Sequence, residues 1–279
     1  MKFDLHCHSN ASDGKLPPSE VLARAAAAEL SLFALTDHDT IAGYEEVAEQ
    51  THPFTLISGI ELSSVWSGVS VHIIGLDFDP KHPAILQAID GLRHAREVRA
   101  HMLDKKLAAR GMPNTLQGAL QFCPDIGQVG RPHFAEYMVQ QGYVQSANKA
   151  FDLWLGSGKI GDIKTEWPTM ESCVKSIVEA QGVAVLAHPL RYKLTFTKLR
   201  RLIDTFAEAG GEAVEVACAQ SPGNLQQALC QYVAKSDLAG SGGSDFHSPD
   251  WHWAQIGRID PIPKAIQPVW ERFKRTKVV

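Results

Sequence analysis

Pairs of side chains that can bind metal occur near both ends of the chain. His6 and His8 follow a short apolar run near the N-terminus, and Asp245 and His247 follow another near the C-terminus. In an extended chain, residues i and i+2 point to the same side, so each pair presents two ligand atoms together. Imidazole nitrogens and carboxylate oxygens bind divalent metal ions. The spacing therefore predicts a metal site built from both pairs.

Five more candidate ligands lie between these pairs, mostly where an apolar run gives way to polar residues. They are Asp13, His38, Glu61, His72 and His188. Each of them alone, like a lone His-x-His, is more often an ordinary structural polar residue. Nine such side chains gathered at one edge of a fold would be costly to desolvate without a partner. We therefore predict that the nine residues converge on metal ions.

His72 depends on a predicted hairpin. Two β-rich runs flank Ser67-Gly68, and a turn centred near Trp66-Ser67 places Glu61 opposite His72. Directly paired residues have Cβ atoms roughly 4.5–5.5 Å apart, which is close enough to share a metal. A slip of one residue would turn His72 to the other face of the hairpin.

Apolar runs alternate with helical patterns over much of the chain, which is the rhythm of an α/β barrel or a layered sheet. Residues 54–61 are predicted to form one of the strands, ending at Glu61. No strand is predicted between about 80 and 180, where the pattern is helical and charged. We predict an α/β body of residues 1–82 and 170–279, with residues 83–169 as an inserted helical domain over its mouth.

The composition is that of an ordinary globular protein. The chain has 279 residues, with 44% hydrophobic and 21% charged residues, and a net charge of −4 excludes a protein that coats nucleic acid by charge alone. It contains no apolar run long enough to span a membrane. Five cysteines without C-x-x-C spacing predict free thiols in a reducing cytoplasm. We predict a cytoplasmic protein with no membrane association and no obligate protein partner.

Five ordered segments resemble the successive motifs of the PHP (polymerase and histidinol phosphatase) family. They are Asp4–Gly14, Thr36–Asp39, Gly59–Glu61, Ala187–Pro189 and Gly243–His247. The resemblance spans the chain apart from the helical insertion. Within the family, the chain is most similar to stand-alone nucleoside 3′,5′-bisphosphate phosphatases and to 5′→3′ exoribonucleases of the ribonuclease AM (TrpH) type. The resemblance implies a distorted (β/α)7 barrel with three divalent metal ions, which are Mn²⁺, Zn²⁺ or Fe²⁺.

The resemblance also implies how the ligands are shared. One metal is expected on His6, His8, Glu61 and Asp245, a second on Glu61, His72 and His188, and a third on Asp13, His38 and His247. His133 is the alternative to His72. Many relatives have His where Asp13 stands, and a carboxylate favours Mn²⁺ over Zn²⁺. Four of these ligands are also expected to be catalytic, namely Asp13, His38, Asp245 and His247.

These expectations predict a metal-dependent phosphoesterase in which a metal-activated hydroxide attacks phosphorus. Arg131, His133 and Arg191 are the predicted substrate-binding residues, since arginine suits bidentate binding of phosphate. A salt bridge at the domain junction is the structural alternative for both arginines. The leading predicted reaction removes the 3′-phosphate of nucleoside 3′,5′-bisphosphates such as adenosine 3′,5′-bisphosphate. The alternatives are a 5′→3′ exoribonuclease on short RNA, a histidinol phosphatase, and an inactive metal-binding module that assembles with other proteins.

Overall fold

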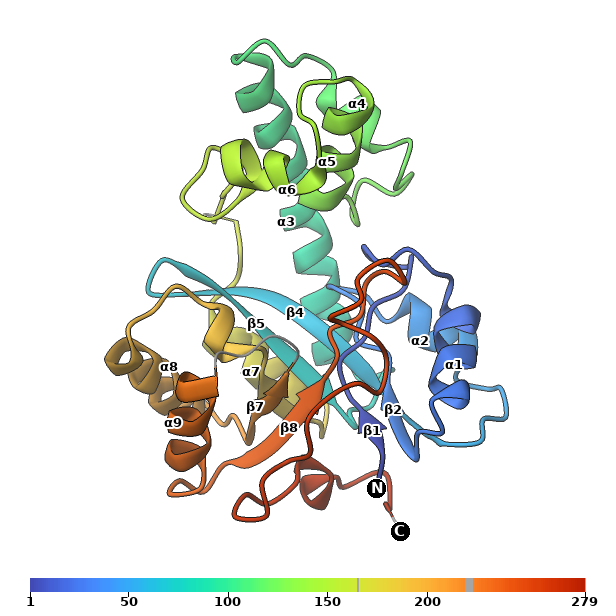
Figure 1. The fold of residues 1–279 in the computed structure, drawn as a ribbon, viewed down its shortest axis with the longest axis vertical. Helices are drawn as coiled ribbons and strands as arrows, with labels where there is room; N and C mark the ends of the chain where they lie inside the picture. Colours follow the sequence, from blue (N-terminus) through green and yellow to red (C-terminus); the bar gives the residue numbers. More distant parts are fainter. Residues whose placement is uncertain (165, 219–222, 279) are drawn as a thin grey trace. The chain divides into compact units, whose positions relative to one another are not determined.

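The chain folds into alternating strands and helices, as a computed structural model shows (Figure 1). The structure describes residues 1–164, 166–218 and 223–278. The α-carbons cluster into two compact units. We call Met1–Ile89 with Pro168–Val279 unit 1, and Asp90–Trp167 unit 2. All the strands in the described part of the chain belong to unit 1.

The first sheet of unit 1 is parallel, with the strand order β1-β2-β3. Its strands are β1 (Phe3–Asp4), β2 (Leu32–Ala34) and β3 (Thr55–Ile57), and the connecting helices are α1 (Pro18–Ala27) and α2 (Ala42–Val47). Val21 of α1 and Val47 of α2 pack with Phe33 and Leu35 in one buried cluster. This packing fixes the carboxyl ends of β1 and β2, and His6, His8 and His38 lie just beyond those ends.

The second sheet of unit 1 has the order β4-β5-β6-β7-β8. The pairs β4-β5 and β5-β6 are antiparallel, whereas β6-β7 and β7-β8 are parallel. The strands are β4 (Gly59–Trp66), β5 (Val69–Leu76), β6 (Val183–Leu186), β7 (Ala213–Cys218) and β8 (Ala239–Gly243). The helices are α7 (Met170–Glu179), α8 (Phe196–Glu208) and α9 (Gly223–Val233), with 3₁₀ turns η2 (Pro189–Arg191) and η3 (Val269–Arg272).

Backbone hydrogen bonds join the two sheets at the carboxyl ends of the parallel strands. The Asp245 N–H donates to the His6 carbonyl at 2.8 Å, and the His8 N–H donates to the Phe246 carbonyl at 2.9 Å. His38 and Glu61 form an isolated bridge on the other side. Residues that follow β1, β2 and β8 are therefore held side by side. The predicted α/β body is present as eight strands in two bridged sheets of the described chain, and the seven-fold barrel stays a prediction.

The predicted hairpin forms, but its register differs from the prediction. Ser63 lies opposite His72, and Glu61 lies opposite Ile74, so the predicted pairing of Glu61 with His72 is wrong. The turn is Ser67-Gly68, with φ of 47° and 74°, which is one residue further along than predicted. Moving the turn by one residue shifts the residue opposite His72 by two, from Glu61 to Ser63. A shift of two leaves His72 on the predicted face of the hairpin, diagonally across from Glu61.

The predicted strand over residues 54–61 is divided between the two sheets. β3 ends at Ile57 and β4 begins at Gly59. Between them the Ser58 hydroxyl donates to the Phe78 carbonyl at 2.7 Å, and the Asp77 N–H donates to the Ser58 carbonyl at 3.0 Å. Ser58 is thus bound to the segment after β5, which ends the pairing of β3 with β2. Glu61 lies inside β4 and not at the end of a strand.

The regular secondary structure in the described residues of unit 2 is helical. It contains most of α3 (Pro83–Ala108), followed by α4 (Thr115–Ala119), α5 (Arg131–Gln140), α6 (Ala147–Ala150) and the π-helical turn η1 (Phe151–Leu155). It has a hydrophobic core of its own that includes Leu103, Leu107, Phe134 and Met138. The predicted division into a body and a helical domain stays a prediction.

Two sequence expectations concern the whole chain. No helix in the described residues combines the length and the apolar character that crossing a bilayer requires. All five cysteines are free, and Cys7 is fully buried beside Phe33 and Phe246. Cys7 therefore packs in the core, between two histidines that point the other way.

Candidate metal centre

The nine predicted ligands lie together in unit 1. Neighbouring side chains in the group are joined by contacts of 4.0 Å or less. The group, which we call the ligand cluster, consists of His6, His8, Asp13, His38, Glu61, His72, His188, Asp245 and His247. Most of its members follow the carboxyl ends of strands, whereas Glu61 and His72 lie on β4 and β5. Residues separated by most of the chain length thus share one site.

Glu61 is the centre of the ligand cluster. Its Oε1 lies 3.0 Å from both His72 Nδ1 and His188 Nε2. Its Oε2 lies 3.0 Å from His38 Nδ1 and 3.3 Å from His8 Nε2. The side chain is 1% exposed, so it is shielded from water. His6 Nε2 also lies 3.4 Å from Oε1, so one buried carboxylate faces five imidazoles, an arrangement suited to a bridging ligand.

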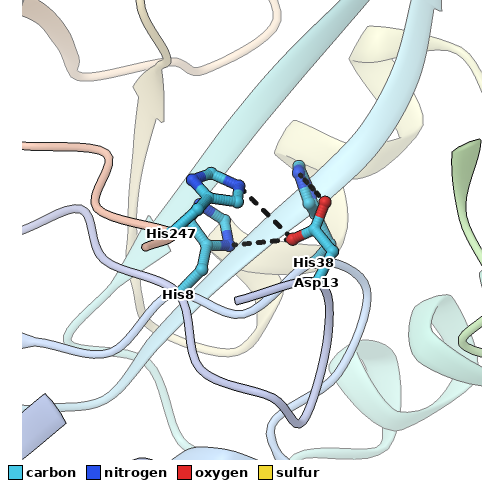
Figure 2. A group of neighbouring side chains, drawn as sticks. All are labelled: His8, Asp13, His38 and His247. Atoms are coloured by element: carbon cyan, nitrogen blue, oxygen red, sulfur yellow. Dashed lines mark ion pairs between the residues drawn. The ribbon is translucent and has the colours of Figure 1, made fainter. Parts of the chain in front are cut away.

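Asp13 gathers a second set of imidazoles (Figure 2). Its Oδ1 lies 3.3 Å from His247 Nε2 and 3.9 Å from His8 Nδ1, and its Oδ2 lies 4.0 Å from His38 Nε2. The ligand atoms of these four residues all lie within 4.8 Å of one another. A single ion between these atoms would contact His8 in addition to the three residues predicted for the third ion, which are Asp13, His38 and His247.

The residues predicted for the other two ions also lie together, in overlapping groups. His6 and His8 group with Glu61, and Asp245 Oδ1 lies 3.3 Å from His6 Nε2 and 3.2 Å from His8 Nε2. His188 groups with His6 and Asp245, whereas His38 groups with Glu61 and His72. All the residues predicted for the first two ions are adjacent. Which ligand belongs to which ion stays a prediction.

Several buried polar atoms in the ligand cluster make no hydrogen bond of normal geometry to a described residue, even where an oppositely charged neighbour lies close. These atoms are His8 Nδ1, Asp13 Oδ1, His38 Nδ1, Glu61 Oε2 and His188 Nδ1. A buried polar atom without a partner costs about 1–3 kcal/mol, so five in one place are not expected for structural reasons. Divalent cations would satisfy such atoms and offset the cost of burying three carboxylates. The cluster therefore fits metal ions.

The three carboxylates of the ligand cluster are ionised, which is the form that binds metal. Burial raises the pKa of Asp13, Glu61 and Asp245, but the surrounding histidines outweigh burial and hold each pKa well below its usual value. These three groups are ionised at neutral pH. Metal ligands must be deprotonated, so the acids are ready to bind a cation.

The histidines of the cluster differ in protonation. Burial lowers the pKa of His38 to about 3 and also lowers that of His188, so both are neutral ligands at neutral pH. Burial lowers the pKa of His8 as well, but Asp245 and Glu61 outweigh it and raise the pKa to about 10. The proton on His8 balances the buried acids. A metal ion would replace this proton, so metal binding is expected to release protons.

Comparison with known proteins identifies the family. The model of the PHP domain matches residues 4–112. A 5′-3′ exoribonuclease of Haemophilus influenzae is 40% identical, with 98% of this chain and 99% of the relative covered. A 3′,5′-nucleoside bisphosphate phosphatase of Chromobacterium violaceum is 36% identical, over 98% of this chain and 96% of the relative. The chain belongs to the PHP family.

A solved structure agrees with this assignment. The structure of an amidohydrolase from Chromobacterium violaceum, with bound sulfate and no metal, superposes with a TM-score of 0.90 and 36% identity, covering 98% of this chain and 96% of that one. The predicted PHP-like α/β fold is confirmed. As a PHP protein with this ligand cluster, the chain is a metal-dependent phosphoesterase of the hydrolase class.

Glu215 is a residue of the PHP site that sequence reasoning missed. Its Oε1 lies 3.0 Å from His6 Nδ1, and its Oε2 accepts the backbone N–H of His188 at 2.6 Å. The side chain is 1% exposed. It therefore orients one ligand and fixes the backbone of a second. The signal in the sequence was a glutamate inside the apolar run 213–216, because a buried carboxylate needs partners.

Two other acids, Asp37 and Asp39, hold the loops that carry predicted metal ligands. Asp37 accepts hydrogen bonds from the Ser9 N–H at 2.7 Å and the Ser12 hydroxyl at 2.6 Å, which folds the loop of Asp13 back towards His8. Asp39 accepts the Ser63 N–H at 2.6 Å. Both flank His38 in the sequence, so the polar segment 36–40 combines one ligand with its supports.

Glycine is required where these loops approach the histidines. A Cβ on Gly14 would lie 2.7 Å from the His8 carbonyl oxygen, and a Cβ on Gly243 would lie 2.2 Å from His6 Cβ. Both distances are too short for any larger residue. These glycines allow the end of β8 and the loop before α1 to lie against the segment that carries His6 and His8.

The predicted substrate-binding residues lie in different units. Arg191 follows His188 in unit 1, where its guanidinium donates a hydrogen bond to Asp245 at the rim of the ligand cluster. Arg131 donates to the Leu155 carbonyl at 3.1 Å, and His133 Nδ1 accepts the Gly130 N–H at 3.0 Å, both within unit 2. The roles of all three in substrate binding stay predictions, as does His133 as a replacement for His72.

Proposed function

We propose that the chain removes the 3′-phosphate of nucleoside 3′,5′-bisphosphates, releasing a nucleoside 5′-monophosphate and phosphate. The observation that carries this proposal is the ligand cluster, with three ionised carboxylates and neutral imidazoles such as His38 around a set of unpartnered buried atoms. The 36% identity to a 3′,5′-nucleoside bisphosphate phosphatase over nearly the whole chain supports the choice of substrate.

The residues that would hold metal are those of the ligand cluster, and we propose that they bind three divalent ions, Mn²⁺ before Zn²⁺ or Fe²⁺. Bound ions of this kind neutralise phosphate oxygens and make water a better nucleophile near neutral pH. The chain supplies buried carboxylates that bridge and fix the ions, of which Glu61 is the central one. Second-sphere groups such as Glu215 hold the imidazoles in position.

Arg191 is the residue of unit 1 that we assign to the substrate. Its guanidinium is bound to Asp245 and is 38% exposed, so it lies at the rim with part of its surface open to a ligand. Burial lowers the pKa of Arg191, but the charge of Asp245 outweighs burial and raises it, so the side chain stays cationic. A phosphate beside the cluster would meet this positive charge.

Substrate comparison tests the proposal. The purified protein, stripped of metal and reloaded with Mn²⁺, is given adenosine 3′,5′-bisphosphate, 3′-AMP and 5′-AMP, and released phosphate is measured. We expect the bisphosphate to be hydrolysed fastest and 5′-AMP to be left intact. Equal rates on all three would contradict the assignment of substrate. No hydrolysis of any of them would favour an inactive assembly module.

The second candidate is a 5′→3′ exoribonuclease, which the 40% identity to such an enzyme favours. The two candidates share one chemical step. Removing the 3′-phosphate of a 5′-phosphorylated nucleotide and releasing that nucleotide from RNA both break the bond between O3′ and phosphorus. They differ only in what remains attached to the phosphorus. A 5′-phosphorylated trinucleotide distinguishes them, because release of 5′-mononucleotides requires room for the chain.

Asp13 offers a test of metal identity. Its carboxylate is a harder ligand than imidazole, so Asp13→His is expected to shift the preference from Mn²⁺ towards Zn²⁺. The measurement is the ratio of Mn²⁺ to Zn²⁺ retained after loading with an equal mixture of both ions. The same ratio in the variant and the parent protein would contradict this role of Asp13.

A further inference from the structure

Two exposed tryptophans lie beside the ligand cluster, in the loop that follows β8. Trp251 is 41% exposed and Trp253 is 52% exposed. The chain has six tryptophans, and the other four are partly buried. A single exposed apolar residue is ordinary, but two large aromatic rings exposed together are typical of a surface that binds a ligand. We call this pair the tryptophan platform.

The rings of the tryptophan platform are stacked and lead away from the metal centre. The Trp251 and Trp253 rings are 5.8 Å apart between centroids, with 16° between their planes. Trp251 also lies 5.6 Å from the ring of His247, which stacks on His8 at 4.1 Å. A line of aromatic rings therefore runs from the ligand cluster to the surface. The platform therefore begins in contact with a predicted metal ligand, His247.

The loop that carries the platform is held by its own hydrogen bonds. The Gln255 side-chain amide donates to the Trp251 carbonyl at 2.8 Å, and the Ala254 N–H donates to the same oxygen at 3.0 Å. The Gly257 N–H donates to the buried carboxylate of Asp4 at 2.8 Å. Because the backbone is fixed, the two rings lose little conformational freedom when a ligand stacks on them.

We propose that the tryptophan platform is a stacking subsite for the nucleobase of the substrate. The inference rests on the proposed function, because it assumes that a phosphate of the same nucleotide occupies the metal centre. The base of a nucleotide is one sugar away from its phosphates, and Trp253 is separated from His247 of the ligand cluster by one ring, that of Trp251. Stacking tolerates any base, since every base has a π face, so the subsite selects nucleotides over other phosphate esters without choosing among bases.

The main test compares a nucleotide with its base-free analogue. Trp253→Ala removes the outer ring and spares Trp251, which contacts His247. With Mn²⁺ enzyme and adenosine 3′,5′-bisphosphate we expect KM to rise about tenfold and kcat to change less than about twofold. With 1,4-anhydroribitol 3,5-bisphosphate, which lacks the base, KM should not change. Trp253→Phe should recover most of the lost affinity, and Tyr143→Ala, which removes another exposed ring, should change neither substrate.

Two results would overturn the inference while leaving the proposed function intact. These are an unchanged KM for the nucleotide in Trp253→Ala, and an equal rise for both substrates. The same KM comparison on a 5′-phosphorylated trinucleotide shows whether the platform holds the base of a free nucleotide or of an RNA end.

A binding measurement separates the inference from the proposed function. Protein loaded with Mn²⁺ is titrated with 5′-AMP, which the proposed activity leaves intact, and quenching of tryptophan fluorescence is followed. Quenching that is lost in Trp251→Ala/Trp253→Ala supports the platform even if the enzyme hydrolyses no nucleotide. Identical quenching in the double variant contradicts it.

Discussion

Glu215 Oε1 lies 3.0 Å from His6 Nδ1, although the two residues are 209 positions apart in the chain. The other oxygen of the same carboxylate accepts the His188 N–H at 2.6 Å. With Nδ1 of His6 donating to Glu215, its Nε2 is the nitrogen that faces the other predicted ligands and can bind a metal ion. One buried acid therefore sets the tautomer of one predicted ligand and the backbone position of another.

Replacing this carboxylate with an amide of the same size should weaken metal binding. Glutamine supplies one acceptor oxygen, but His6 Nδ1–H and His188 N–H are two donors. Either a donor is left unpaired, or His6 adopts the tautomer that cannot bind metal through Nε2. Glu215→Gln should therefore weaken metal affinity about 10–100-fold, measured by competition with a chelator.

The matched control for this variant is Glu212→Gln. Glu212 lies just before β7, and its carboxylate pairs with Lys274 at 3.7 Å, at the surface. It should leave metal affinity unchanged. Circular dichroism should show both variants folded. An affinity within twofold of the parent protein in Glu215→Gln would contradict the positioning role.

The difference between Glu215 and His8 shows what the sequence could predict. His8 has a local signal, since it forms an i, i+2 pair with His6 after an apolar run. Such pairs also predicted where Asp245 and His247 would lie. Glu215 has no ligand spacing around it, and only its isolation in an apolar strand distinguishes it. Local patterns thus predicted the ligands, whereas their supports depend on which strands become neighbours.

The hairpin shows a second limit of prediction. The sequence predicted the turn and the face of His72, but not its partner, because the turn lies at Ser67-Gly68. A two-residue turn is fixed by backbone conformation, which the side chains specify only weakly. The break at Ser58 was missed because it depends on a hydrogen bond to Phe78, which is distant in sequence. Contacts between distant segments decided both features.

Removal of metal should lower the stability of unit 1. The ligand cluster buries three ionised acids, and the proton on His8 balances their charge only in part once cations are removed. A ligand at 100 times its Kd stabilises a folded protein by about 2.7 kcal/mol, and each kcal/mol raises Tm by roughly 2–4 °C. We expect dialysis against a chelator to lower Tm by several degrees and Mn²⁺ to restore it. Calorimetry measures both, and a Tm that does not respond to Mn²⁺ would argue against a metal site.

We expect the ion pair between Asp125 and Arg93 to make a pH-dependent contribution to the stability of unit 2. The two Arg93 Nη atoms donate to the two carboxylate oxygens at 2.6 and 2.7 Å. Burial raises the pKa of Asp125, but the hydrogen bonds from Arg93 and Gly127 outweigh it and lower the pKa below its usual value. Because the pKa of Asp125 is lower in the folded than in the unfolded chain, the ion pair stabilises the fold at pH values above the unfolded pKa of about 3.9. That stability is lost as the pH falls through the folded pKa.

Asp125→Asn should therefore lower stability at pH 7 and have less effect in acid. Both side chains are partly exposed, at 42% and 43%, so solvent screening limits the expected loss to about 1 kcal/mol or less. The measurement is the Tm difference between variant and parent at pH 7 and at pH 3, at low ionic strength. Asp152→Asn, which alters an exposed acid in the same unit, serves as the control. A difference that grows as the pH falls would contradict the pairing.

We expect the substitution Gly68→Ala to lower stability through backbone conformation alone. Its φ is 74°, in the left-handed region, and an added Cβ would meet no described atom within 4 Å. Gly68→Ala should therefore cost about 1–2 kcal/mol through strain, with no clash involved. Gly91 is the matched control, because it also has open space around its Cα but lies inside α3 without a positive φ. Gly91→Ala should gain about 0.4–1 kcal/mol. Urea unfolding measures both, and equal effects of the two substitutions would contradict the assigned turn and, with it, the register that keeps His72 beside Glu61.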